Sequence, residues 1–261
     1  AASDVYKRQS EYGQATGKTI TPFVLPIVFA EAENSNGLLK VLIYLGCVML
    51  FCNAPFLNNQ KPYMILRCKR KGWYLGENMY VWLAAFLYML FISLISLIAV
   101  LPTVSTNRLW GEIAGDFVVN QRSLIPVYTW GLVMPVRVIQ NYYPLAAFLY
   151  TFITGWLSIV FIGKLMYLLN LKIGKKTIGI SAAVFFIMLD PVAVYFTNFK
   201  QYGLLYVSPI NWSSLENINT VSGYPHLSGE YMFIMYVILI GVESLLSYIC
   251  SIKMDIEIKI V

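Results

Sequence analysis

The stretch Tyr80–Leu101, YVWLAAFLYMLFISLISLIAVL, decides the fold because it runs for 22 residues without a charged side chain. A helix needs about 20 mostly apolar residues to cross a hydrocarbon core of roughly 30 Å. Further apolar runs of similar length occur at Leu38–Phe56, Pro144–Leu169, Ile178–Thr197 and Tyr231–Ser251. They are continuously apolar and do not alternate as barrel strands do. The sequence therefore predicts an all-α, polytopic transmembrane helix bundle with five spans.

The composition argues against an ordinary soluble domain. Hydrophobic residues make up 58% of the chain and charged residues 12%, whereas soluble domains carry about 25% charged residues. The formal net charge of +6 raises nucleic acid as a partner, but the basic residues lie in loops, as in a membrane protein. We expect a lipid bilayer as the surroundings and no nucleic acid.

The basic residues also predict the orientation, because cytoplasmic loops carry an excess of Lys and Arg. The loop between the first two spans holds five cations against one acid, Glu77, and the loop between the third and fourth holds three. We place both loops and the C-terminus in the cytoplasm, and the longer loops Pro102–Tyr143 and Asn198–Glu230 outside. This predicts a multi-pass protein of the cell membrane. The cations are Lys61, Arg67, Lys69, Arg70 and Lys71, then Lys172, Lys175 and Lys176.

The start of the chain is expected to be truncated. Residues 1–9 resemble a translated sequencing-adapter junction and are set aside as an artefact. Residues 10–37 are expected to be external or interfacial; within them Ile20–Ala30 is too short to span and is expected to be interfacial or re-entrant. The transmembrane domain then covers residues 38–261. An external N-terminal segment needs a preceding span, so the intact protein is expected to have six.

Two carboxylates fall inside the predicted spans, and an ionisable group at membrane depth is functional by default. Asp190 precedes Pro191 near the external end of its span, where it can simply reach the interface. Glu243 lies near the middle of the last span and is the better candidate for a substrate contact or a proton site. A structural hydrogen bond from Glu243 to a neighbouring helix is favoured over a transport role.

Catalytic and cofactor motifs are missing from the sequence. The run Gly13–Thr19 (GQATGKT) has one residue too few between its glycines for a phosphate-binding loop, and no apolar strand precedes it. The single histidine, His226, excludes a histidine-pair zinc site, and no hydrolase elbow occurs. We expect no enzyme activity and no cofactor, and any energy from ATP must come through another subunit.

Two kinds of segment punctuate the spans. Tyr63–Tyr74 combines an apolar patch, a cationic cluster and an aromatic pair, which suits either a short helix at the cytoplasmic interface or charge that only sets topology. Asn53–Phe56 (NAPF) and Ser208–Trp212 (SPINW) are interpreted as a helix stop and a loop turn.

Together, the implied six-span layout, the basic first internal loop, the long loop before the last span and the NAPF and SPINW segments resemble permease subunits of type-2 ABC exporters from gut Firmicutes. The resemblance implies a homodimer or heterodimer of permeases working with separate cytoplasmic ATPase subunits by alternating access. It assigns ATPase coupling to Lys61–Glu77, with Arg67, Arg70, Trp73 and Glu77 as the residues to test, and exit-shielding helices to Asn198–Glu230. The long external loop Pro102–Tyr143 departs from the family pattern.

Other functions remain open. A non-transporting membrane accessory, such as a sensor or an immunity protein, would need no ATPase. A secondary transporter would have more spans, an inverted repeat and clustered intramembrane charges. A membrane enzyme is the weakest alternative, because no acid, base and nucleophile converge in the sequence.

Overall fold

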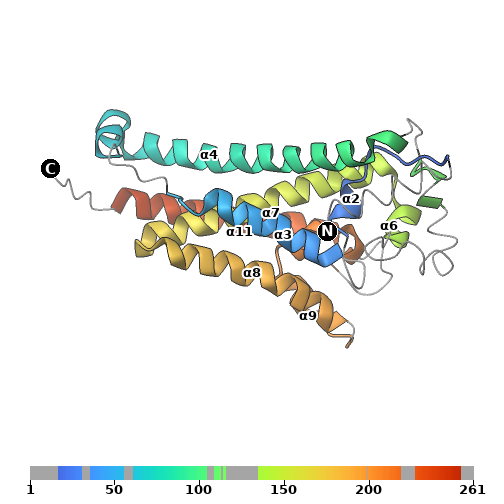
Figure 1. Cartoon of the computed structure of the whole chain (residues 1–261). Coiled ribbons are helices and arrows are strands. Elements are labelled where there is room, and N and C mark those ends of the chain that lie inside the picture. The colour runs from blue at the N-terminus through green and yellow to red at the C-terminus, as the bar shows by residue number, and fades with distance from the viewer. Residues whose placement is uncertain are drawn as a thin grey trace.

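The computed structural model of this chain describes residues 17–30, 36–55, 61–104, 109–112, 114–115, 135–197, 199–218 and 227–253. The expectations for residues 1–16, including the adapter-like start, lie outside these ranges. Within them the chain is almost entirely helical and forms no strand, only isolated β-bridges. Long helices run roughly along one direction and form an elongated bundle (Figure 1). The predicted all-α class is confirmed.

Four of the described helices are long and apolar enough to cross a membrane: α4 (Lys61–Val100), α7 (Pro144–Ile173), α8 (Lys176–Thr197) and α11 (Gly229–Lys253). They contain four of the five predicted spans. Their outward faces carry large apolar side chains, such as Leu83, Phe91, Phe185 and Val237, each more than half exposed. An apolar surface of this extent suits hydrocarbon and not water, so the fold is that of a membrane-embedded helical protein.

The remaining predicted span corresponds to α3 (Asn36–Phe51), an apolar helix of 16 residues. At 1.5 Å per residue it is about 24 Å long, shorter than a hydrocarbon core of roughly 30 Å. The helix ends at Phe51, five residues before the predicted boundary at Phe56, and the chain then turns through residues 52–55. The NAPF segment thus acts as the expected helix stop, over the part that the structure describes.

The central helix of the bundle is α7, which contacts α3, α4, α8 and α11. In the most apolar stretch of each long helix, half of the residues of α7 are buried, against 22 to 28% in the other three. Glycines allow this close packing, because a Cβ atom at Gly163 would lie 2.9 Å from Val81 Cγ1. The helix begins with Pro144 at its first position and ends at Ile173. Gly174 follows it, and its φ of +74° is the left-handed conformation usual for a residue that caps a helix C-terminus.

The bundle has two distinct ends. At the basic end, the start of α4, the end of α11 and the α7–α8 turn come together (Figure 1). Arg70 of α4 donates a hydrogen bond to Ile252 O of α11, and Lys176 Nζ lies 3.0 Å from Asn53 Oδ1 beyond α3. Both basic loops therefore lie at one end, as the alternating topology requires.

The opposite end, here called the inserted end, contains short helices that pack into the bundle. The segment around α2 (Leu25–Val28) is buried against α3, α4 and α7, so Ile20–Ala30 packs inside the bundle rather than lying along its surface. The segment 208–218, called the inserted segment, carries η2 (Asn211–Ser213) and η3 (Leu215–Asn217). Three other short elements at this end are η1 (Leu101–Thr103), α6 (Val136–Asn141) and α9 (Gly203–Val207).

Candidate functional site

A buried ion pair joins α3 to α8 at the inserted end. Lys40 Nζ lies 2.9 Å from Asp190 Oδ1, and the two side chains are 0% and 2% exposed. A single buried charge is strongly unfavourable, whereas a pair that is close and further hydrogen-bonded is tolerated. Neither Lys40 nor Asp190 can therefore be buried at low cost without the other. Asp190 precedes Pro191, the proline inside α8.

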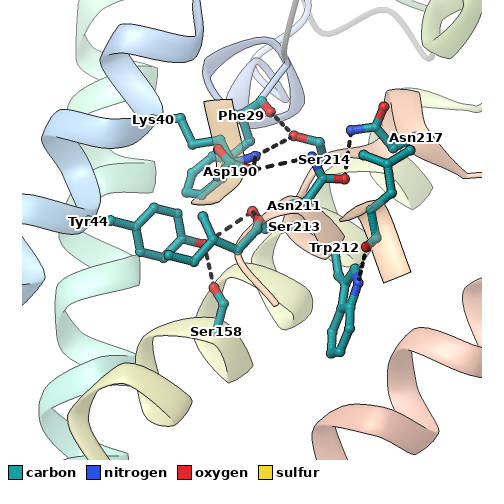
Figure 2. Close-up of polar contacts among 12 residues, drawn as sticks. Phe29, Lys40, Tyr44, Ser158, Asp190, Asn211, Trp212, Ser213, Ser214 and Asn217 are labelled. Atoms are coloured by element: carbon teal, nitrogen blue, oxygen red, sulfur yellow. Dashed lines mark hydrogen bonds and ion pairs between the residues drawn. The ribbon is translucent and has the colours of Figure 1, made fainter. Parts of the chain in front are cut away.

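The inserted segment completes the hydrogen bonding of this pair (Figure 2). Lys40 Nζ donates to Ser214 Oγ at 3.0 Å, and Asn211 Nδ2 donates to Asp190 Oδ1 at 3.2 Å. Ser214 Oγ in turn donates to the carbonyl of Phe29, next to α2. One polar network therefore connects α3, α8, the chain after α2 and the inserted segment.

A second polar layer lies one turn further along α3. Tyr44 Oη shares a hydrogen bond with Ser158 Oγ of α7 and lies 3.1 Å from Ser213 Oγ of the inserted segment (Figure 2). All three residues are fully buried. This layer attaches the inserted segment to the central helix as well as to α3.

Aromatic contacts hold the other side of the inserted segment. The Trp212 ring packs edge-to-face on Tyr236 of α11 with centroids 5.1 Å apart, and Trp212 Nε1 donates to Leu205 O at 2.9 Å. Tyr236 Oη donates to Pro209 O at 2.6 Å. The SPINW segment was expected to be a loop turn. That expectation was incomplete: the chain does turn there, but Ser208 to Trp212 are all buried. Asn211, the Trp212 ring nitrogen and the Pro209 carbonyl have hydrogen-bond partners inside the bundle.

A second group of buried polar side chains lies between α4, α7 and α11, nearer the basic end. Lys164 Nζ of α7 donates to Asn78 Oδ1 of α4 and to Ser244 Oγ of α11, the latter at 2.6 Å. Glu243 is the acid that acts electrostatically on Lys164. We call this group the three-helix junction; it also includes Tyr167, on the same face of α7 as Lys164.

The two acids predicted as intramembrane sites are both buried. Reaching the interface was the alternative to a functional role for Asp190, but the residue is 1% exposed because Lys40 and Asn211 satisfy it inside the bundle. Glu243 is 6% exposed. The hydrogen bond expected between Glu243 and a neighbouring helix is not found among the described residues, where its Oε2 is buried without a partner. The adjacent Ser244 makes the polar contact to α7 instead.

The four predicted coupling residues do not share one environment. All lie on α4, which continues through the basic segment and bends at Lys69. Arg67 is exposed, and Arg70 contacts the end of α11. Trp73 is 6% exposed in an apolar cluster with Tyr74 and others, and Glu77 is half-buried. Only Arg67 is presented openly, while Trp73 anchors the segment to the bundle.

Sequence reasoning missed the two buried lysines, Lys40 and Lys164. Both lie inside predicted spans, and the rule that treats an ionisable residue at membrane depth as functional applies to cations as well as to acids. That rule would have selected both. No comparable signal marks Asn211 or Ser214, because Asn and Ser are common in exposed turns.

Comparison of the chain with protein-family models, with curated proteins and with solved structures returned no match. The geometry itself limits the chemistry. Among the described residues no group of three His, Cys, Asp or Glu side chains is placed to hold a metal ion. In the Lys40 network the cation and the acid are in direct contact and both are further hydrogen-bonded, an arrangement we call closed, which suits fixing a segment in place. At the three-helix junction, by contrast, a carboxylate oxygen has no hydrogen-bond partner among the described residues.

Proposed function

We propose that this chain is the membrane-spanning permease subunit of an ATP-driven exporter, with the ATPase supplied by a separate subunit. The observation that supports this most is the start of α4, a basic helical segment that is bent away from the long helix and yet anchored to the bundle. Such a segment can receive a movement from a cytoplasmic partner and pass it to the spans.

The bend lies at Lys69, whose φ of 60° and ψ of 162° interrupt an otherwise continuous helix. On its bundle side, Trp73 is buried and Tyr74 Oη donates to Ser244 O of α11 at 2.7 Å. Arg70 is also bonded to α11. Because these contacts are close together, a force applied before the bend acts directly on α4 and α11.

The outward side of this segment is cationic. Arg67, Lys69 and Lys71 are exposed. The α7–α8 turn lies at the same end of the bundle (Figure 1), and its lysines are also exposed. Long-range attraction between opposite charges favours docking of an acidic surface here. An ATPase subunit with acidic residues around its docking cleft fits this end.

The proposal takes α3 as a fifth span and includes a sixth span before it, with the basic end in the cytoplasm. Two such subunits, identical or different, would form the transport path between them. In this arrangement the inserted segment lies at the external end, where it would shield the exit. The buried contacts of Trp212 and Tyr236 support a fixed position for this segment.

The test is to purify the full-length gene product in mild detergent and to identify co-purifying proteins by mass spectrometry. We expect an ATPase subunit with the wild-type protein and its loss from the Arg67→Glu, Lys71→Glu double variant. The matched control is the Arg137→Glu, Lys200→Glu variant, which reverses two exposed cations at the opposite end and should retain the ATPase.

The alternative is a non-transporting accessory, sensor or immunity protein. The Lys40 network favours this alternative because the network is closed. It suits fixing the structure and exposes no binding group among its described residues. If no ATPase co-purifies under conditions that retain a known exporter complex, the permease proposal fails and the accessory function replaces it.

A further inference from the structure

The three-helix junction contains a carboxyl group whose surroundings do not suit a permanent negative charge. Glu243 is 6% exposed, and its Oε2 atom is buried with no hydrogen-bond partner in the described residues. A buried carboxylate oxygen without a donor is much less favourable than the same group in its neutral form. The hydrogen bonds of Lys164 go to two neutral oxygens, on Asn78 and Ser244, and not to this carboxylate.

The other groups that face the junction come from the two helices packed against α11. From α7 these are Lys164 and Tyr167, whose hydroxyl is also buried without a partner in the described residues. From α4 they are Tyr74, which donates to Ser244 O, and Glu77, which acts electrostatically on Tyr167. Among these groups, Lys164 is the cation that acts electrostatically on Glu243.

A proton suits this place better than a metal cation does. Lys164 already supplies one positive charge beside the carboxyl, and a metal ion would be repelled by it. Oxygen-bound cations also need several ligands, and no metal-binding group of acids occurs among the described residues. A proton needs only one oxygen atom, and Oε2 is available.

We propose that Glu243 is a proton-binding site, with Lys164 as the neighbouring charge that distinguishes its two states. Binding takes a proton from water and forms the Oε2–H bond, with no transfer of electrons. While Glu243 is neutral, Lys164 stays on Asn78 of α4 and Ser244 of α11. When the proton leaves, the carboxylate attracts Lys164 and weakens its hold on Asn78, so that proton release loosens the contact between α4 and α7. This site does not depend on the exporter function.

The test is infrared spectroscopy of the full chain in lipid nanodiscs, with glutamate labelled with carbon-13, across a pH titration. We expect the carbonyl band of a protonated glutamic acid near neutral pH, lost in Glu243→Gln. The matched control is Glu230→Gln on the same helix, whose side chain is exposed and whose removal should leave the band unchanged.

A second variant separates a proton site from a merely structural residue. In Lys164→Gln the positive neighbour is removed, so the carboxylate is less favoured and the band should persist to higher pH than in the wild type. This readout remains if Glu243→Gln does not fold. A wild-type protein without a protonated glutamic acid band, a band that survives Glu243→Gln, or an unchanged titration in Lys164→Gln would each overturn the proposal.

Discussion

The two ends of the bundle treat buried charge in opposite ways. At the inserted end, Lys40 and Asp190 are in direct contact, and Ser214 and Asn211 complete their hydrogen bonds. At the three-helix junction, nearer the basic end, the cation binds neutral oxygens, while one oxygen of the acid has no donor among the described residues. A closed network of charges determines position, whereas an open one leaves a group that can change its charge. The predictions below use this contrast, beginning with the largest expected effect.

The closed network should be the most sensitive part of the molecule. Asp190→Leu removes the counter-charge in contact with the buried Lys40, so we expect the free energy of unfolding to fall by about 3–5 kcal/mol. Reversible unfolding in detergent micelles measures this. Replacing both charges, as Lys40→Met with Asp190→Leu, should recover most of the loss because an apolar pair of similar size is tolerated. A double variant as unstable as the single one would show that the lost stability does not come from leaving one charge of the ion pair unpaired.

Ser214→Ala removes the hydroxyl that joins Lys40 to the carbonyl of Phe29. The loss of hydrogen bonds to a buried charge should lower the free energy of unfolding by about 1–3 kcal/mol in the same assay. Ser181→Ala on the exposed face of α8 is the matched control and should change it little. Equal effects of the two changes would argue against a closed network at the inserted end.

How well the sequence predicts these two ends depends on the range of the interactions. The long helices and the common position of the two basic loops follow from local hydropathy and charge, so they were predicted. The inserted segment was not, because its burial depends on Lys40, 174 positions before Ser214. Residues 208–218 have the composition of an exposed turn, and only the fold reveals their partners.

The same reasoning applies to single residues. Glu243 was found because an acid in an apolar run is conspicuous, while Lys40 lies near a span end, where a lysine normally marks topology. Trp73 was chosen for coupling because the resemblance assigns that role to the basic first internal loop. Its burial could not be predicted, because Tyr167 and Leu171, its neighbours in the apolar cluster, belong to a helix far along the chain.

At the basic end, relieving backbone strain should change the free energy of unfolding by less than the changes above and in the opposite direction. A φ of 60° with a ψ of 162° at Lys69 is a conformation that costs a residue with a side chain about 1–3 kcal/mol, and that glycine adopts readily. Lys69→Gly should therefore raise the free energy of unfolding by about 1 kcal/mol. Lys71→Gly, two residues later in regular helix, should lower it by about 1 kcal/mol. If both variants are destabilised alike, the bend is not present in the protein in its membrane.

The smallest effect is expected at the junction itself. If Glu243 is already neutral at the pH of the assay, Glu243→Gln should change the free energy of unfolding by less than about 1 kcal/mol. Asp190→Asn, the equivalent change at the inserted end, should cost clearly more because it leaves Lys40 without its counter-charge. Similar losses for the two variants would remove the distinction between a closed and an open network.

The separation of Lys40 from its partner has a consequence for how the protein is made. Asp190 is synthesised 150 residues after Lys40, which at 5–20 residues per second takes roughly 10 to 30 s. During that interval α3 is a short helix whose buried lysine still lacks Asp190, a poor candidate for stable insertion on its own. The final position of α3 must therefore await the arrival of α8 and the inserted segment, although α3 is synthesised before both.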